Sequence, residues 1–102
     1  MTSFVSVARA SEIPVNSARC VRVHERLIAI YNLDGEFFAT DDTCTHARAS
    51  LSEGQICGDE IVCPLHFATF DIKTGRCTGG PAIDDLHAYP LRVVDDEIQI
   101  EK

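Results

Sequence analysis

Short runs of alternating apolar and polar residues dominate this chain, and no helical repeat of any length occurs. Alternation with a period of two is typical of half-buried β-strands. Val21 and Val23 share one face of the run Arg19–His24, and the other face carries polar residues and a cysteine. The alternation is strict in residues 97–101, which predicts a strand with one wet face. The pattern therefore predicts an all-β fold.

Turn signals divide the predicted strands. Asp34-Gly35, Gly58-Asp59 and Asp95-Asp96 each separate two apolar runs and are typical of hairpin turns. Residues 50–54 and 77–85 are expected to be irregular. The predicted strands are Ser3–Ala8, Arg19–His24, Arg26–Asn32, Glu36–Thr40, Gln55–Cys57, Ile61–Cys63, Leu86–Val94 and Glu97–Ile100, and Ala68–Asp71 is expected to lead the chain on from the second hairpin.

Length and charge narrow the classes of function. A chain of 102 residues is expected to form one domain. Nine basic and sixteen acidic residues give a net charge of −7, which disfavours nucleic acid and anionic membranes and is compatible with a basic protein partner. The N-terminus lacks the features of a signal peptide, and no stretch approaches the roughly 18 apolar residues of a membrane span. We therefore expect a cytoplasmic protein.

Two Cys/His pairs carry the candidate chemistry. Cys44-Thr45-His46 is followed, after sixteen residues, by Cys63-Pro64-Leu65-His66. Two thiolates and two imidazoles suit a tetrahedral zinc ion, and they equally suit an iron–sulfur cluster in which two His replace two Cys on one iron. Structural zinc fingers usually pair like with like, whereas each pair here is mixed. The mixed pairs favour a cluster in which Cys44 and Cys63 bind one iron and His46 and His66 bind the other.

The sequence C-T-H…C-P-L-H resembles the Rieske [2Fe–2S] signature at all four ligand positions and at their spacing. The resemblance covers nearly the whole chain and is most specific over residues 44–82, where Gly79-Gly80-Pro81 is similar to the third, proline-containing loop of that family. It implies a single Rieske domain over residues 1–102 with one [2Fe–2S] cluster. It also implies a basal β-sandwich or barrel with a small inserted β subdomain, about residues 43–82, that holds the cluster.

Four positions depart from the respiratory Rieske proteins. The two cysteines that form a disulfide between the cluster loops in that branch are matched here by Ala49 and Leu65. Its hydroxyl-bearing Ser and Tyr are matched by Ala68 and Phe70. The chain therefore resembles the low-potential branch, the ferredoxins that serve bacterial aromatic-ring dioxygenases.

This resemblance implies a one-electron carrier that is not itself an enzyme. It implies that a monomer takes electrons from an NAD(P)H-dependent flavoprotein reductase and passes them to a terminal oxygenase. Two alternatives remain at this point. One is a small Rieske-fold subunit of another enzyme, such as a nitrite reductase, and the other is a zinc-stabilised interaction module.

Residues outside the motif receive more ordinary interpretations. His24 and His87 are expected to be surface or partly buried residues and not ligands. Phe67 suits equally an apolar rim over the cluster, with Pro81, and the core. The remaining cysteines, interpreted as reduced thiols packed in the core, are Cys20, Cys57 and Cys77. Four acids are interpreted as solvated turn residues, with a basic partner as the alternative: Asp41, Asp42, Asp84 and Asp85.

Overall fold

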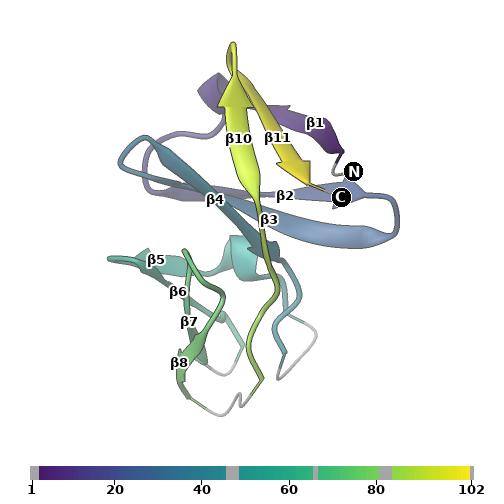
Figure 1. Cartoon of the computed structure of the whole chain (residues 1–102). Helices are drawn as coiled ribbons and strands as arrows, with labels where there is room; N and C mark the ends of the chain where they lie inside the picture. The colour runs from purple at the N-terminus through teal and green to yellow at the C-terminus, as the bar shows by residue number, and fades with distance from the viewer. Residues whose placement is uncertain (1–2, 46–48, 66, 81–83, 102) are drawn as a thin grey trace.

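The computed structural model describes residues 3–45, 49–65, 67–80 and 84–101. Within these residues the chain forms three antiparallel sheets (Figure 1). Two short 3-10 turns, η1 (Ala10–Glu12) and η2 (Leu51–Glu53), accompany the sheets. The strands are β1 (Phe4–Arg9), β2 (Ser17–Val23), β3 (Arg26–Leu33), β4 (Glu36–Asp41), β5 (Gln55–Cys57), β6 (Glu60–Val62), β7 (Thr69–Asp71), β8 (Cys77–Gly79), β9 (Ala88–Tyr89), β10 (Leu91–Val94) and β11 (Glu97–Glu101).

Two of the sheets are built from the two ends of the chain and form the basal region. Their strand orders are β1-β11-β10 and β2-β3-β4-β9. The alternation predicted for residues 97–101 is confirmed, because Ile98 and Ile100 are fully buried whereas Glu97 is exposed. The apolar faces of the two sheets meet in one core cluster of Ile13, Val23, Ile28, Ile30, Ala39, Tyr89, Ile98 and Ile100.

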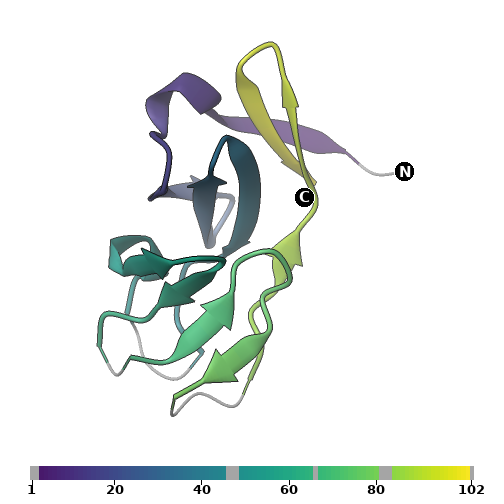
Figure 2. The same cartoon turned by 90° about the vertical axis from the view of Figure 1, so that its left-hand side faces the viewer.

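The third sheet, with strand order β5-β6-β7-β8, is formed by residues from the middle of the chain. It lies at the end of the molecule opposite the β10–β11 hairpin, as the two views show (Figures 1 and 2). Its apolar face shares a core cluster with β3, which contributes Ala29 and Tyr31 beside Ile61 and Phe70. This small sheet and the loops around it carry the candidate metal ligands.

Most predicted strands are confirmed, with shifts of one or two residues at their ends. The predicted strand Leu86–Val94 is divided at Pro90, where the chain passes from β9, which pairs with β4, to β10, which pairs with β11. Pro90 donates no backbone hydrogen bond, so it suits the crossing between two sheets. No helix among the described residues is long and apolar enough to cross a membrane.

Two segments that were expected to be irregular are ordered by distant contacts. Residues 77–79 form β8, which pairs with β7, and the hydroxyls of Thr69 and Thr78 lie 2.8 Å apart across that pair. Residues 51–53 form η2, whose Leu51 is fully buried. Residues 77–79 show no strand pattern of their own, so the prediction was wrong there, whereas the single turn η2 lies within the loop predicted for residues 50–54.

The expectation that the three remaining cysteines pack in the core was also wrong in part. Cys20 and Cys57 are exposed, and Cys77 is half-buried against the core cluster beneath the small sheet. The two cysteines of the predicted metal motif are instead the buried ones.

Candidate metal centre

Cys44 and Cys63 are the most buried cysteines in the described part of the chain. Their exposed fractions are 4% and 0%. Cys44 follows β4 and Cys63 follows β6, and both belong to the core cluster beneath the small sheet. Two segments that are distant in the sequence therefore bring two thiols into one apolar core cluster.

The first loop is closed by backbone hydrogen bonds at its base. The Cys44 N–H donates to the carbonyl of Ala49 at 3.0 Å, and Thr43 forms an isolated β-bridge with Ser50. The Thr45 hydroxyl donates to the carbonyl of Asp84 at 2.8 Å. That bond ties the first loop to the segment that enters β9, so the loop is held on two sides.

The second loop turns tightly after Cys63. The Cys63 N–H donates to the carbonyl of Ala68 at 2.7 Å, and the Phe67 N–H donates to the carbonyl of Cys63 at 3.1 Å. Phe67 has a φ of 61°, which is uncommon for a residue with a side chain, and its exposed fraction is 71%. Of the two interpretations of Phe67, the apolar rim therefore fits and the core residue does not.

The third loop approaches the second at Gly80. Gly80 has a φ of +83°, and a Cβ atom at this position would lie 2.6 Å from the Cα of Ala68. Only glycine allows this conformation and this contact without strain. The glycine at residue 80 therefore allows the backbones of the two loops to lie close together. Pro81, the other predicted rim residue, lies outside the described residues.

Two of the four predicted ligands, His46 and His66, lie outside the described residues. Within the described ranges, no three or more His, Cys, Asp and Glu side chains come together as a metal site. The donor set that is described fits an iron–sulfur cluster, because two buried cysteines on separate loops can supply the two thiolates of one iron. The apolar surroundings also suit a cluster that must be kept from water.

The positions that depart from the respiratory pattern differ in their exposure. Ala68 and Phe70 are fully buried, so the chain places no side-chain hydroxyl at these two positions beside the second loop. Leu65 is exposed by 54% and, like Phe67, is a large apolar side chain that is not buried. Ala49 is half-buried against the core cluster.

The expectation that Asp42 is a solvated turn residue was wrong. Its exposed fraction is 1%, and its carboxylate accepts hydrogen bonds from the Ser50 hydroxyl at 2.6 Å and the Ser52 N–H at 2.9 Å. Desolvation by burial, followed by the nearby Asp42 carboxylate, raises the pKa of the Cys20 thiol from 9.0 to about 11. No periodic pattern marks Asp42 in the sequence, and its neighbour Asp41 has the same side chain.

The other residues outside the motif behave more nearly as expected. His24 and His87 are exposed. The His87 ring packs edge-on against Tyr89 with 4.4 Å between ring centroids, and the Tyr89 hydroxyl donates to Asp41. Burial, and then the bond to Asp41, raises the pKa of Tyr89. Asp84 and Asp85 are exposed, as expected of turn acids.

The comparisons with known proteins agree with this geometry. The family model described as "Rieske [2Fe-2S] domain" matches residues 3–90. The biphenyl dioxygenase ferredoxin subunit of Pseudomonas sp. (strain KKS102) is 37% identical over 100 residues, covering 97% of this chain and 92% of the relative. The 3-phenylpropionate/cinnamic acid dioxygenase ferredoxin subunit of Photorhabdus laumondii subsp. laumondii is 44% identical over 95 residues, covering 92% of this chain and 90% of the relative.

Solved structures give the same result. The ferredoxin-like chain matched in a complex of reduced oxygenase and oxidized ferredoxin of carbazole 1,9a-dioxygenase has a TM-score of 0.90 and 36% identity, covering 96% of this chain and 92% of that chain. A chain described as an NADH-dependent nitrite reductase small subunit from Mycobacterium tuberculosis has a TM-score of 0.88 but 19% identity, covering 100% of this chain and 96% of that chain. The second likeness shows the fold alone.

Proposed function

Because this chain belongs to the Rieske [2Fe–2S] domain family, we propose that it carries single electrons between two proteins of an aromatic-ring dioxygenase system. The observation that carries the proposal is the buried pair Cys44 and Cys63 beneath an exposed apolar surface, in a chain similar throughout to ferredoxin subunits. Like those subunits, the chain is an electron-transfer component and not the catalyst.

The proposed ligands are Cys44 and Cys63 on one iron and His46 and His66 on the other. A [2Fe–2S] cluster, when bound, accepts and gives up one electron. The chain supplies two thiolates from a dry core and holds their loops by backbone hydrogen bonds, including the one from Cys63 to Ala68. This part of the proposal assigns residues 43–82 to a cluster-binding subdomain within one domain of 102 residues.

The proposed docking surface surrounds the cluster loops. Leu65 and Phe67 expose 54% and 71% of their surface, although large apolar side chains are usually buried. Asp84 and Asp85 are exposed on the segment that Thr45 contacts. Exposed apolar side chains and exposed carboxylates on the segments around the proposed site suit a partner with apolar and basic groups, and the net charge of −7 favours the same partner.

The proposed partners are an NAD(P)H-dependent flavoprotein reductase as the donor and a terminal oxygenase as the acceptor. The relatives' names place them in multicomponent dioxygenases, and one structural neighbour is a ferredoxin in complex with its oxygenase. We propose that the chain acts as a monomer in the cytoplasm, because transient docking to two partners in turn requires a free cluster end.

The direct test is a reconstituted electron-transfer assay. The purified protein should contain two irons and two acid-labile sulfides per chain, should be reduced by NAD(P)H with a catalytic amount of a dioxygenase flavoprotein reductase, and should be reoxidised by the matching terminal oxygenase with its aromatic substrate. Stoichiometric zinc in protein made with adequate iron, or a cluster that neither partner reduces or oxidises, would contradict the proposal. Constant co-purification with a large reductase subunit would favour the nitrite-reductase alternative.

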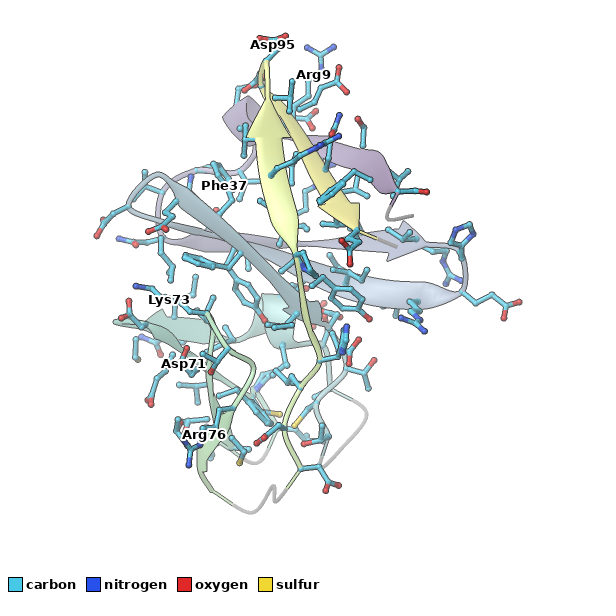
Figure 3. All side chains as sticks on the ribbon, viewed as in Figure 1. Arg9, Phe37, Asp71, Lys73, Arg76 and Asp95 are labelled. Atoms are coloured by element: carbon cyan, nitrogen blue, oxygen red, sulfur yellow. The ribbon has the colours of Figure 1, made fainter. Side chains whose placement is uncertain are left out.

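A matched pair of variants tests the docking surface. Asp84→Asn removes a charge near the first cluster loop, and Asp95→Asn removes the same charge in the β10–β11 turn at the opposite end of the molecule (Figure 3). Asparagine tolerates the positive φ of 49° at residue 95, so the control should fold normally. We expect added salt and Asp84→Asn each to slow electron transfer severalfold, and Asp95→Asn to have little effect. Equal rates in both variants would place docking elsewhere.

A further inference from the structure

Asp42 is a buried carboxylate two residues before Cys44. Only 1% of its surface is exposed, and it forms no ion pair with any residue that the structure describes. A buried charge without hydrogen-bond donors is strongly unfavourable, so the fold must supply donors around it. The residues that supply these donors show which segments of the chain the carboxylate connects.

The donors come from segments on both sides of the first cluster loop. The Ser50 hydroxyl and the Ser52 N–H donate to the two carboxylate oxygens at 2.6 Å and 2.9 Å, and the two serine hydroxyls lie 2.9 Å apart. The Cys20 thiol of β2 also hydrogen-bonds the carboxylate. The Asp42 backbone adds bonds to Leu27 and Leu51 at 2.9 Å and 2.7 Å.

These bonds close the base of the loop that carries the first ligand pair. Asp42 immediately precedes that loop, and Ser50 and Ser52 immediately follow it. The bridge between Thr43 and Ser50 and the bond from Cys44 to Ala49 continue the same ladder toward the cluster. A change at Asp42 would therefore be transmitted first to the position of Cys44.

An open hollow of about 410 Å³ lies beside the loop base and is lined by Leu27, Asp42, Thr43, Ala49 and Ser50. Beside this hollow, the hydrogen bonds to one carboxylate join the two ends of the loop.

We propose that Asp42 is a positioning residue for the cluster: its buried carboxylate clamps the two ends of the first cluster loop and thereby sets where Cys44 presents its ligand atom. The inference rests on the cluster that is part of the proposed function, but it needs neither protein partner. Groups that orient metal ligands in this way typically change metal affinity by 10–100-fold when they are removed.

Asp41 provides a matched control. It is adjacent in sequence and carries the same charge, but its carboxylate accepts bonds from the Tyr89 hydroxyl and the His87 N–H of the basal region. Asp41→Asn and Asp42→Asn therefore remove the same charge, and each weakens the hydrogen bonds that its carboxylate accepts. Only the second change affects the loop base, so both should lower the unfolding temperature while only one should disturb the cluster.

The test compares the intact, cluster-loaded variants. We expect Asp42→Asn to speed the loss of iron to a chelator by about 10–100-fold and to shift the visible circular dichroism of the oxidised protein and the EPR g-values of the reduced protein. Asp41→Asn should change the rate of iron loss by less than about twofold and leave both spectra unchanged. Equal rates in the two variants, or unchanged spectra in Asp42→Asn, would overturn the proposal.

If Asp42→Asn fails to fold, Ser50→Ala tests the same role of the Asp42 carboxylate. It removes one donor and keeps the carboxylate, so iron loss should be a few times faster and the spectra should shift in the same direction. Wild-type rates and spectra in Ser50→Ala would overturn the clamp. Failure of the proposed function would appear differently, as a wild-type protein whose cluster exchanges no electrons with a reductase or an oxygenase.

Discussion

The basal sheets and the small sheet are built by the same chain but stabilised in different ways. β2 and β3 of the basal region contain seven and eight residues, whereas β5, β6, β7 and β8 contain three residues each. The long strands bury continuous apolar faces, such as Ile28 and Ile30 against Ile98 and Ile100. Three-residue strands bury too little to be stable alone. The comparison shows that the cluster end depends on its surroundings.

Two kinds of contact connect the small sheet to the basal region. Ala29 and Tyr31 of β3 share a core cluster with the small sheet. Lys73, which follows β7, lies 5.7 Å from the centre of the Phe38 ring in β4 and 3.7 Å from the Asp59 carboxylate (Figure 3). The ion pair is exposed and lies within the small-sheet region, so the shared core is the main connection between the two regions. The bound cofactor is the remaining source of stability, because metal binding and folding are coupled.

The largest expected effect is loss of the cluster. Cys44→Ser or Cys63→Ser should abolish iron incorporation, whereas the three variants at the other cysteines should keep full iron content: Cys20→Ser, Cys57→Ser and Cys77→Ser. Without the cluster, amide hydrogen exchange should become at least tenfold faster in β5–β8 and remain slow in β2 and β3. Iron analysis and hydrogen exchange measure both effects.

Two outcomes would contradict this account of the cluster end and the basal region. A brown Cys63→Ser protein with an unaltered spectrum would contradict its assignment as a ligand. Equal acceleration of exchange in the basal and small sheets would show that the two regions unfold as one unit.

The next largest effect is on the free energy of unfolding, at the point where the third loop packs against the second. Gly80→Ala would place a Cβ 2.6 Å from the Cα of Ala68 at a φ of +83°, whereas Gly58→Ala, at a φ of +61°, meets nothing within 4 Å. Backbone strain alone should cost Gly58→Ala about 1 kcal/mol of the free energy of unfolding. Gly80→Ala should cost about 2–4 kcal/mol because the clash is added to the strain. Denaturant unfolding of both variants measures the difference, and equal costs would mean that the third loop moves aside freely.

The reactivity of the Cys20 thiol tests whether β2 packs against Asp42 at the base of the first cluster loop. Its folded pKa of about 11 lies above the ordinary value of 9.0, so the folded thiol holds its proton more tightly. At pH 8 the folded chain should react with iodoacetamide at Cys20 about a hundredfold more slowly than the unfolded chain, since the thiolate is the nucleophile. Mass spectrometry of the alkylated peptide measures both rates.

The same shift predicts the direction of a stability change. Because the pKa is raised on folding, its contribution to stability is fully present below pH 9 and is lost as the pH rises to about 11. Cys20→Ser should flatten this part of the pH profile. Equal alkylation rates in the folded and unfolded chains would show that neither burial nor the Asp42 carboxylate raises the pKa of Cys20.

The smallest effect is on the reduction potential. Ala68 and Phe70 are buried and offer no hydroxyl, so the potential should lie near the negative end of the Rieske range, closer to −150 mV than to +300 mV, and should be nearly independent of pH between about 6 and 8. Ala68→Ser with Phe70→Tyr should raise it by some tens of millivolts if the new hydroxyls donate to the cluster sulfurs. Voltammetry from pH 6 to 8 measures both. A clearly positive wild-type potential would contradict the assignment to the low-potential branch.

Local patterns in the sequence determined most of the basal region and pointed to the two buried cysteines as candidate ligands. Alternation in β2 and β11 predicted their buried faces, and Asp34-Gly35 and Asp95-Asp96 predicted their hairpins, because both signals act within a few residues. The Cys/His spacing predicted that Cys44 and Cys63 share one site, and both lie in one core cluster. The roles of His46 and His66 remain predictions from that spacing.

Only the tertiary structure decided which loop residues are buried. Asp41 and Asp42 are identical neighbours, yet one contacts Tyr89 and the other is buried beneath the first cluster loop. Residues 77–79 became a strand because β7 was available to pair with them, and Phe67 was exposed by a turn with positive φ. Whether a residue at the end of a strand is buried depends on which distant segment packs over it. No periodic pattern in the sequence predicts that contact.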